Sequence, residues 1–183
     1  MLVLLLNLIV FVVIVAALVM VAVLGCSYWL GEAKVELDLD NRSKFRLISF
    51  GEHEAVFESN FLIANAGKRP DAMVLDAFSR HLLPEEQYDK AFVRTSLERD
   101  GFRRSDGYFE AFPFEGMKSE RLIYTLVLRS KQPVTEIIEE LPNLKLEVYV
   151  NYVGKEDYKI KRWYFVVPRE ELKQAIKEAG VVA

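Results

Sequence analysis

Side chains that build metal and redox sites are scarce in this sequence of 183 residues, which has one cysteine and two histidines. The single cysteine, Cys26, excludes a disulfide within the chain. Because no cysteine follows residue 26, a zinc site in the rest of the chain would need carboxylates from distant segments. We expect neither a metal site nor a cofactor.

Sequence signatures of catalysis are also missing. No phosphate-binding loop and no dinucleotide-binding glycine pattern occurs, and no serine stands in the G-x-S-x-G turn of hydrolases. The acidic pairs Glu85–Glu86 and Glu139–Glu140 are adjacent only in sequence and occupy positions typical of helix starts or solvated faces. We therefore expect that the protein is not an enzyme.

Charge is absent from the first 31 residues, whereas all 24 Lys and Arg and all 27 Asp and Glu lie in residues 32–183. Two such different segments exclude a single soluble globule and an intrinsically disordered chain. The net charge of −3 gives no electrostatic reason to expect nucleic acid as a partner. We divide the chain into a transmembrane anchor with its juxtamembrane segment, residues 1–31, and a folded domain, residues 32–183.

The uncharged segment contains a long apolar run, Leu2–Leu24, interrupted only by Asn7. As a helix this run is about 35 Å long, enough to cross a hydrocarbon core of about 30 Å. A lone strand would leave its backbone groups unpaired in lipid, so helix is the workable state. Tyr28 and Trp29 follow where the headgroups begin and are candidate anchors at the membrane interface. The sequence predicts a single-pass membrane protein that contacts the bilayer through residues 2–24.

Two alternatives concern the processing of this segment. A cleaved secretory signal has a shorter apolar stretch behind a basic region, which this sequence lacks. Val23–Cys26 partly resembles the cleavage box of bacterial lipoproteins, although Leu24 is larger than usual before the glycine. Lipidation of Cys26 would make the protein a lipoprotein-like accessory or ligand-capturing subunit, and this stays the alternative hypothesis.

Two sequence features disagree on which side of the membrane the folded domain lies. Lys34, Arg42 and Lys44 follow the apolar run, which by the positive-inside rule favours a cytoplasmic domain. These cations alternate with acidic residues, however, and the rule weakens for a long folded domain. A single N-terminal anchor ahead of a β-rich domain is typical of exported proteins, so we expect the extracytoplasmic side.

Alternation of apolar and polar residues dominates the rest of the chain. It predicts strands over residues 34–40 and 108–114, and a hairpin over 144–152 and 158–167. Three more strands are predicted over 45–50 and 122–128, which are apolar on both faces, and over 55–64, which is rich in Phe and Ile. Residues 73–83 fit a strand or a helix. Residues 84–92 have helical spacing, although 91–97 alternate again. Short helices are predicted over 135–141 and, with apolar residues at i, i+3, i+4 and i+7, over 170–179.

About seven short strands and few helices predict a mainly β fold. We expect an antiparallel β-sandwich of the immunoglobulin-like or fibronectin-like kind, with a short C-terminal helix. The Cys…Trp…Cys pattern of immunoglobulins is absent, so this prediction rests on strand number and alternation.

Two basic clusters are candidate contacts with a protein partner or with lipid headgroups. Arg103 and Arg104 lie in a predicted loop, and Lys159, Lys161 and Arg162 precede three aromatic residues. The aromatic residues at 109, 112 and 114 could form an exposed patch, although packing in the core is favoured for most of them. Together these features predict a membrane-anchored, non-catalytic β-sandwich that binds or scaffolds another membrane or envelope protein.

Overall fold

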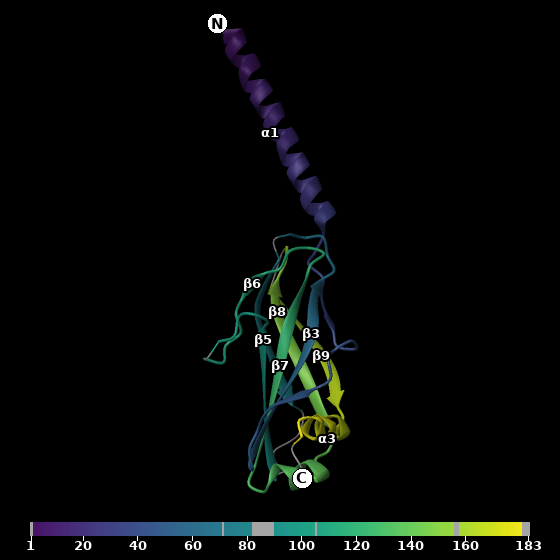
Figure 1. Cartoon of the computed structure of the whole chain (residues 1–183). Coiled ribbons are helices and arrows are strands. Elements are labelled where there is room, and N and C mark those ends of the chain that lie inside the picture. Colours follow the sequence, from purple (N-terminus) through teal and green to yellow (C-terminus); the bar gives the residue numbers. More distant parts are fainter. Residues whose placement is uncertain (1, 71, 82–89, 105, 156–157, 181–183) are drawn as a thin grey trace.

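The molecule consists of a long helix joined to one end of an elongated β-sheet body (Figure 1). The structure, a computed structural model, describes residues 2–70, 72–81, 90–104, 106–155 and 158–180. The body contains two antiparallel sheets and two short helices, which confirms the prediction of a mainly β domain between an apolar N-terminal helix and a short C-terminal helix.

Helix α1 (Leu2–Leu30) runs for 29 residues and is exposed over most of its length. It continues past the apolar run through Cys26, Tyr28 and Trp29, and ends at Gly31. The φ of Gly31, +63°, is the left-handed conformation that glycine adopts at helix ends without strain. By length and composition α1 is fit to cross a membrane, and a signal sequence near the N-terminus would meet the same criterion.

The first sheet has β3 and β7 at its centre. These strands pair along their whole length, from Glu54–Arg129 to Ala64–Ser119. The other strands pair with the outer edges of this central pair, which gives the order β1-β3-β7-β5 with β2 also on β3. The strands are β1 (Val35–Asp38), β2 (Arg46–Phe50), β3 (Glu54–Asn65), β5 (Ala91–Arg99) and β7 (Ser119–Ser130).

The second sheet has the order β6-β4-β8-β9. Its strands are β4 (Met73–His81), β6 (Phe112–Pro113), β8 (Leu144–Val153) and β9 (Tyr158–Val167). The hairpin predicted from the chain's cleanest alternation is confirmed, because β8 and β9 pair from Leu144–Val167 to Val153–Tyr158. Among the strands that the structure describes, β9 pairs with β8 alone and forms an edge of the sheet.

One hydrophobic core joins the inner faces of the two sheets. Alternate residues of β7, from Leu122 to Leu128, and of β8, from Leu144 to Tyr152, are buried in it. Tyr124 lies at the centre, with Phe45 and Phe165 edge-on to its ring at 6.0 and 5.4 Å. Burial raises the pKa of the Tyr124 hydroxyl, which is within 3.1 Å of the Ser79 hydroxyl.

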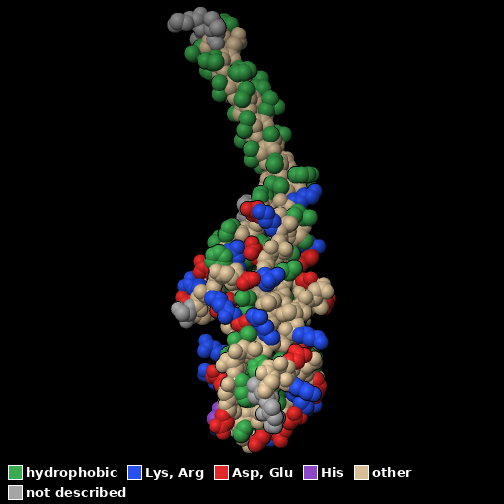
Figure 2. All heavy atoms as spheres, viewed as in Figure 1, with side chains coloured by type: hydrophobic (Ala, Val, Ile, Leu, Met, Phe, Trp, Pro, Cys, Tyr) green, Lys and Arg blue, Asp and Glu red, His purple; other side chains and the backbone are tan. Residues whose placement is uncertain are grey.

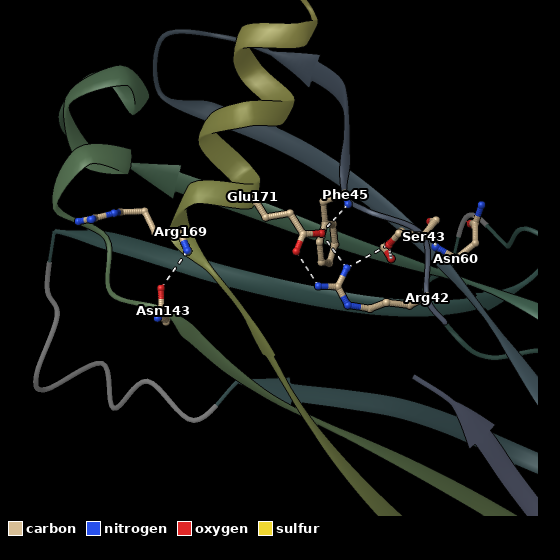
Figure 3. Close-up of polar contacts among 8 residues, drawn as sticks. Arg42, Ser43, Phe45, Asn60, Asn143, Arg169 and Glu171 are labelled. Atoms are coloured by element: carbon tan, nitrogen blue, oxygen red, sulfur yellow. Dashed lines mark hydrogen bonds and ion pairs between the residues drawn. The ribbon is translucent and has the colours of Figure 1, made fainter. Parts of the chain in front are cut away.

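Helices α2 (Val134–Glu140) and α3 (Arg169–Glu178) are located at the end of the body remote from α1 (Figure 1). Arg42 fixes α3 to the loop between β1 and β2, since its two terminal nitrogens donate to the Glu171 carboxylate at 2.7 Å each (Figure 3). The backbone N–H of Phe45 donates to the same carboxylate at 2.8 Å. This bidentate ion pair, largely buried on both sides, fastens the C-terminal helix to the first sheet.

Local spacing misled the prediction in two places. Ala91 and Phe92 are not helical; they open strand β5, as the alternation over residues 91–97 also predicted, and pair with Ser130 and Arg129 of β7. The free edge of β7 outweighs one turn of helical spacing. The rest of that predicted helix, residues 84–89, lies outside the described residues. The predicted strand over 108–114 is reduced to β6, although Phe112 and Phe114 are buried as expected.

Candidate interaction surfaces

The outward side of β9 exposes an apolar row along the free edge of the second sheet. Its members, here called the β9 face, are Tyr158, Ile160, Arg162, Tyr164 and Val166. The four uncharged members are each at least half exposed. They point outward because the odd-numbered residues of β9, among them Trp163, Phe165 and Val167, turn toward the core. Exposed aromatic and aliphatic side chains in one row, here with Arg162 between them, are typical of a surface that meets another molecule.

Aromatic rings extend this row across the sheet. Phe78 of β4 lies opposite Tyr149 of β8, and the two rings stack at 5.0 Å and 7°. Tyr149 in turn lies opposite Arg162, whose guanidinium is 4.7 Å from the ring centre of Tyr164. The Tyr149 hydroxyl donates to the nearly buried Glu147 at 2.6 Å. The rings are therefore held in fixed positions, which lowers the entropy cost of binding.

The side chains of Lys159 and Lys161 point to the opposite side of β9 from Arg162. Lys159 donates to the Glu32 carboxylate at 3.0 Å, and Lys161 donates to the Val35 carbonyl at 2.9 Å. Both lysines therefore bridge the second sheet to the chain that leaves α1. The hydrogen bond from Lys159 is the main reason that the pKa of Glu32 is lowered. Inward-turned charges of this kind are a common protection of edge strands against unspecific pairing.

Arg103 and Arg104 lie on the other side of the sandwich from Arg162. Arg103 binds the nearly buried Glu58 on the outer side of the first sheet and lies 3.4 Å from Glu98. Arg104 binds Asp106, and this hydrogen bond lowers the pKa of Asp106 to about 2. The structure therefore does not bring the two predicted basic clusters together, and their contact with a partner or lipid stays a prediction.

The end of the sandwich next to α1 contains a group of contacts that sequence reasoning missed. Arg69, only 5% exposed, donates to the Gly31 carbonyl at 2.8 Å and reaches the Ser27 hydroxyl at 3.4 Å. The Lys68 ammonium lies 4.6 Å from the ring centre of Trp29. Together these contacts fix the last turn of the helix against the turn after β3.

Asn65 organises the same end from within. Its side chain donates to the Phe114 carbonyl at 2.9 Å and accepts from the backbone N–H groups of Lys34 and Gly67. Gly67 passes so close to the chain after α1 that a Cβ there would stand 2.5 Å from the Glu32 carbonyl oxygen. The sequence signal was the segment Asn65–Pro70, which predicts a turn but not what the turn touches.

The remaining predicted site residues lie along α1. Cys26 is exposed on the helix, as are Tyr28 and Trp29. Lipidation of Cys26 stays a prediction. Within the described ranges, no group of three or more His, Cys, Asp or Glu is arranged to hold a metal ion.

Comparison with known proteins finds no matching family model and no matching curated protein. Among solved structures, the GAE domain of GGA2p from Saccharomyces cerevisiae matches with a TM-score of 0.34 and 12% identity, over 75% of this chain and 98% of that domain. A yeast GGA1 GAE domain–P21 structure matches with a TM-score of 0.31 and 13% identity, over 67% and 98%. Neither match assigns this chain to a family.

Proposed function

We propose that the protein is a single-pass membrane protein whose immunoglobulin-like sandwich binds or scaffolds another membrane protein, without catalysis. The observation that carries this proposal is the β9 face, an exposed apolar row beside stacked aromatic rings. A surface of this composition gains free energy when a partner covers it.

Strand order supports the immunoglobulin-like assignment. The constant type of that fold has strands A-B-E-D in one sheet and C-F-G in the other. With β1, β3, β4, β5, β7, β8 and β9 taken as A to G, the observed orders β1-β3-β7-β5 and β4-β8-β9 are the same. β2 and the two-residue β6 are additions at the edges.

Membrane anchoring rests on α1, whose 29 residues correspond to a length of about 43 Å. An exposed helix of this length and composition would be insoluble in water without lipid around it. We infer that the sandwich lies on the extracytoplasmic side, as the arrangement of one N-terminal anchor and a β-rich domain favours. Digestion of the sandwich by protease added to intact cells, with lysed cells as the accessibility control, tests the side.

The direction of the sheets determines what kind of partner fits. The strands run from the α1 junction toward the remote end of the body (Figure 1), so the β9 face extends away from the bilayer rather than along it. A partner that covers the row from Tyr158 to Val166 must itself protrude from the membrane beside this protein. We therefore propose an integral membrane protein with an exposed apolar or strand-edge surface.

Photocrosslinking in native membranes tests this function. A photoreactive phenylalanine analogue replaces Ile160, and a matched variant carries it at Leu62, an exposed aliphatic residue on the outer side of the first sheet. We expect one discrete adduct with an integral membrane protein from position 160 and none from position 62, and we expect Tyr164→Asp to abolish the adduct. Equal labelling from both positions, or none from 160, would overturn the proposal.

The alternative, a lipoprotein-like subunit that captures a ligand, is compatible with one feature of the junction. Ser27 and Gly31, which Arg69 contacts, both follow Cys26, so removal of residues 1–25 would leave these contacts in place. Acylation of Cys26 and loss of residues 1–25 would favour this alternative.

A further inference from the structure

We propose that the end of the sandwich next to α1 rests on the bilayer and inserts the side chain of Met117 into the headgroup layer beside Trp29. This inference rests on the membrane anchoring proposed above. It adds a second lipid contact, made by the folded domain itself, through residues other than the basic clusters that the sequence suggested.

The length of α1 determines the height of the sandwich above the bilayer. The apolar run Leu2–Leu24 already exceeds the hydrocarbon core of about 30 Å. The next six residues, Gly25–Leu30, add about 9 Å, so that α1 in full, about 43 Å, matches the thickness of a bilayer with its headgroups, about 40–45 Å. Hydrophobic side chains cover the visible side of α1 down to the junction, where the first Lys and Arg side chains appear (Figure 2). The loops around the end of α1 therefore begin at headgroup level.

Hydrogen bonds place Met117 among these loops. Its N–H donates to the carbonyls of Asn65 and Gly67, at 2.8 and 3.0 Å. Gly67 itself touches the chain that leaves α1, and Gly116 packs so tightly against the backbone of Lys68 that a Cβ would come within 2.5 Å of it. The turn that carries Met117 therefore packs on the turn after β3, which itself contacts the chain after α1.

Met117 has an unusual conformation for its residue type. Its φ is +59°, and no other non-glycine residue in the described part of the chain has a positive φ. Its side chain is nevertheless 74% exposed. A left-handed backbone is strained for a non-glycine residue. The two backbone hydrogen bonds of Met117 hold this conformation, and a lipid layer would give its exposed, flexible thioether apolar contacts that water does not provide.

Neighbouring side chains suit a headgroup environment. Lys68 stands over the ring of Trp29, an amphipathic residue that favours the membrane interface. Lys118 pairs with Glu115 at 2.5 Å, and both side chains are more than half exposed. Such an exposed ion pair is weak enough for the ammonium to exchange its carboxylate for a lipid phosphate.

The experiment uses the full chain in phosphatidylcholine vesicles. In a Cys26→Ser background, Met117→Cys carries a polarity-sensitive fluorophore, and Lys177→Cys on the remote helix α3 carries the same label as a control. We expect lipid-borne nitroxide to quench the label at 117 at least threefold more than the label at 177, and aqueous iodide to show the reverse order. Equal quenching at the two positions would overturn the proposal.

A label on the native cysteine distinguishes a failure of the Met117 contact from a failure of the membrane anchoring on which it rests. A label on Cys26 of the otherwise unchanged chain reports whether the end of α1 lies in lipid. Quenching of this label by the lipid-borne nitroxide, together with a water-exposed label at 117, would overturn the Met117 contact alone. A water-exposed label at Cys26 would overturn the anchoring as well.

Discussion

Single side chains with a buried charge determine how the parts of this molecule are fastened together. Arg69 joins the turn after β3 to the end of α1, and Arg42 joins the loop after β1 to α3. Each guanidinium is removed from water and surrounded by oxygen acceptors, so its hydrogen bonds are charge-assisted and stronger than neutral ones. Loss of Arg42 removes two donors from the Glu171 carboxylate, and loss of Arg69 removes the side-chain donor of the Gly31 carbonyl.

Arg69→Ala should destabilise the sandwich. The Gly31 carbonyl loses its charged donor in a largely buried place, and we expect the free energy of unfolding to fall by about 2 kcal/mol. Urea denaturation of the detergent-solubilised chain measures this change. Arg121→Ala is the control, because Arg121 is 60% exposed and its ion pair with Asp100 is long, at 3.8 Å. Equal effects of the two substitutions would contradict the role assigned to Arg69.

The ion pair at Glu171 makes stability depend on pH. Burial alone would raise the pKa of Glu171, but the hydrogen bonds from Arg42 and the Phe45 N–H outweigh it and hold the pKa below the usual 4.5. The stabilisation is therefore complete above pH 4.5 and is lost as the pH falls through the lowered pKa.

Glu171→Gln tests this dependence. We expect the difference in free energy of unfolding between wild type and variant to be constant above about pH 5 and to shrink at lower pH. Glu136→Gln, at an exposed carboxylate of α2, should show no such change. A wild-type–variant difference that stays unchanged down to pH 3 would refute a lowered pKa at Glu171.

Packing between elements depends on a few tight approaches and on one buried face per helix. α3 buries Leu172, Ala175 and Ile176, and of its charged residues Glu171 is also largely buried, in the ion pair with Arg42. The turn after β3 approaches the chain after α1 closely only because residue 67 has no side chain. The packing of α3 and the close approach at Gly67 therefore stabilise the two ends of the sandwich.

Leu172→Ala should lower the free energy of unfolding by about 2–4 kcal/mol, because it leaves a cavity under α3 in a fully buried position. Lys177→Ala, an exposed change on the same helix, should stay within about 0.5 kcal/mol. Thermal unfolding followed by circular dichroism compares the two. A small effect at Leu172 would mean that α3 does not close the core.

Gly67→Ala should destabilise the junction by about 1–3 kcal/mol, since the new methyl group collides with the Glu32 carbonyl. Gly51→Ala is the matched control, because a Cβ there meets its nearest atom at an ordinary 3.7 Å. Chemical denaturation of both variants should separate them clearly. A tolerated Gly67→Ala would show that the chain after α1 can move away from the turn.

Sequence alone predicted those elements whose side chains alternate between core and water. The β8–β9 hairpin was found because burial of one face imposes a period of two. β7 was found because its residues are apolar on both faces, apart from Thr125, as in a central strand. The alternation along β9 also predicts the direction of two lysines, which was overlooked. Lys159 and Lys161 lie on the same side of the strand as Trp163 and Phe165, and so turn inward. Arg69 could not be predicted, because its partners lie about 40 residues away and are backbone or hydroxyl groups without a pattern of their own.

At the scale of the whole molecule, an apolar helix and an elongated sandwich are joined end to end (Figure 1). The contacts of Arg69, Lys68 and Asn65 hold this junction in one geometry. If α1 spans a bilayer, the sandwich stands on it, and the β9 face is presented sideways to neighbours in the same membrane. The proposed partner binding therefore depends first on whether the mature protein keeps its helix.

The intact mass of the protein extracted from the membrane fraction tests this most directly. The account predicts a chain that retains residues 1–25, with the soluble fraction empty. A shorter mass that begins at an acylated Cys26 would contradict the transmembrane anchor and favour the lipoprotein alternative. A shorter, unmodified chain in the soluble fraction would show that α1 is a cleaved signal, and the account of a membrane-anchored sandwich would fall.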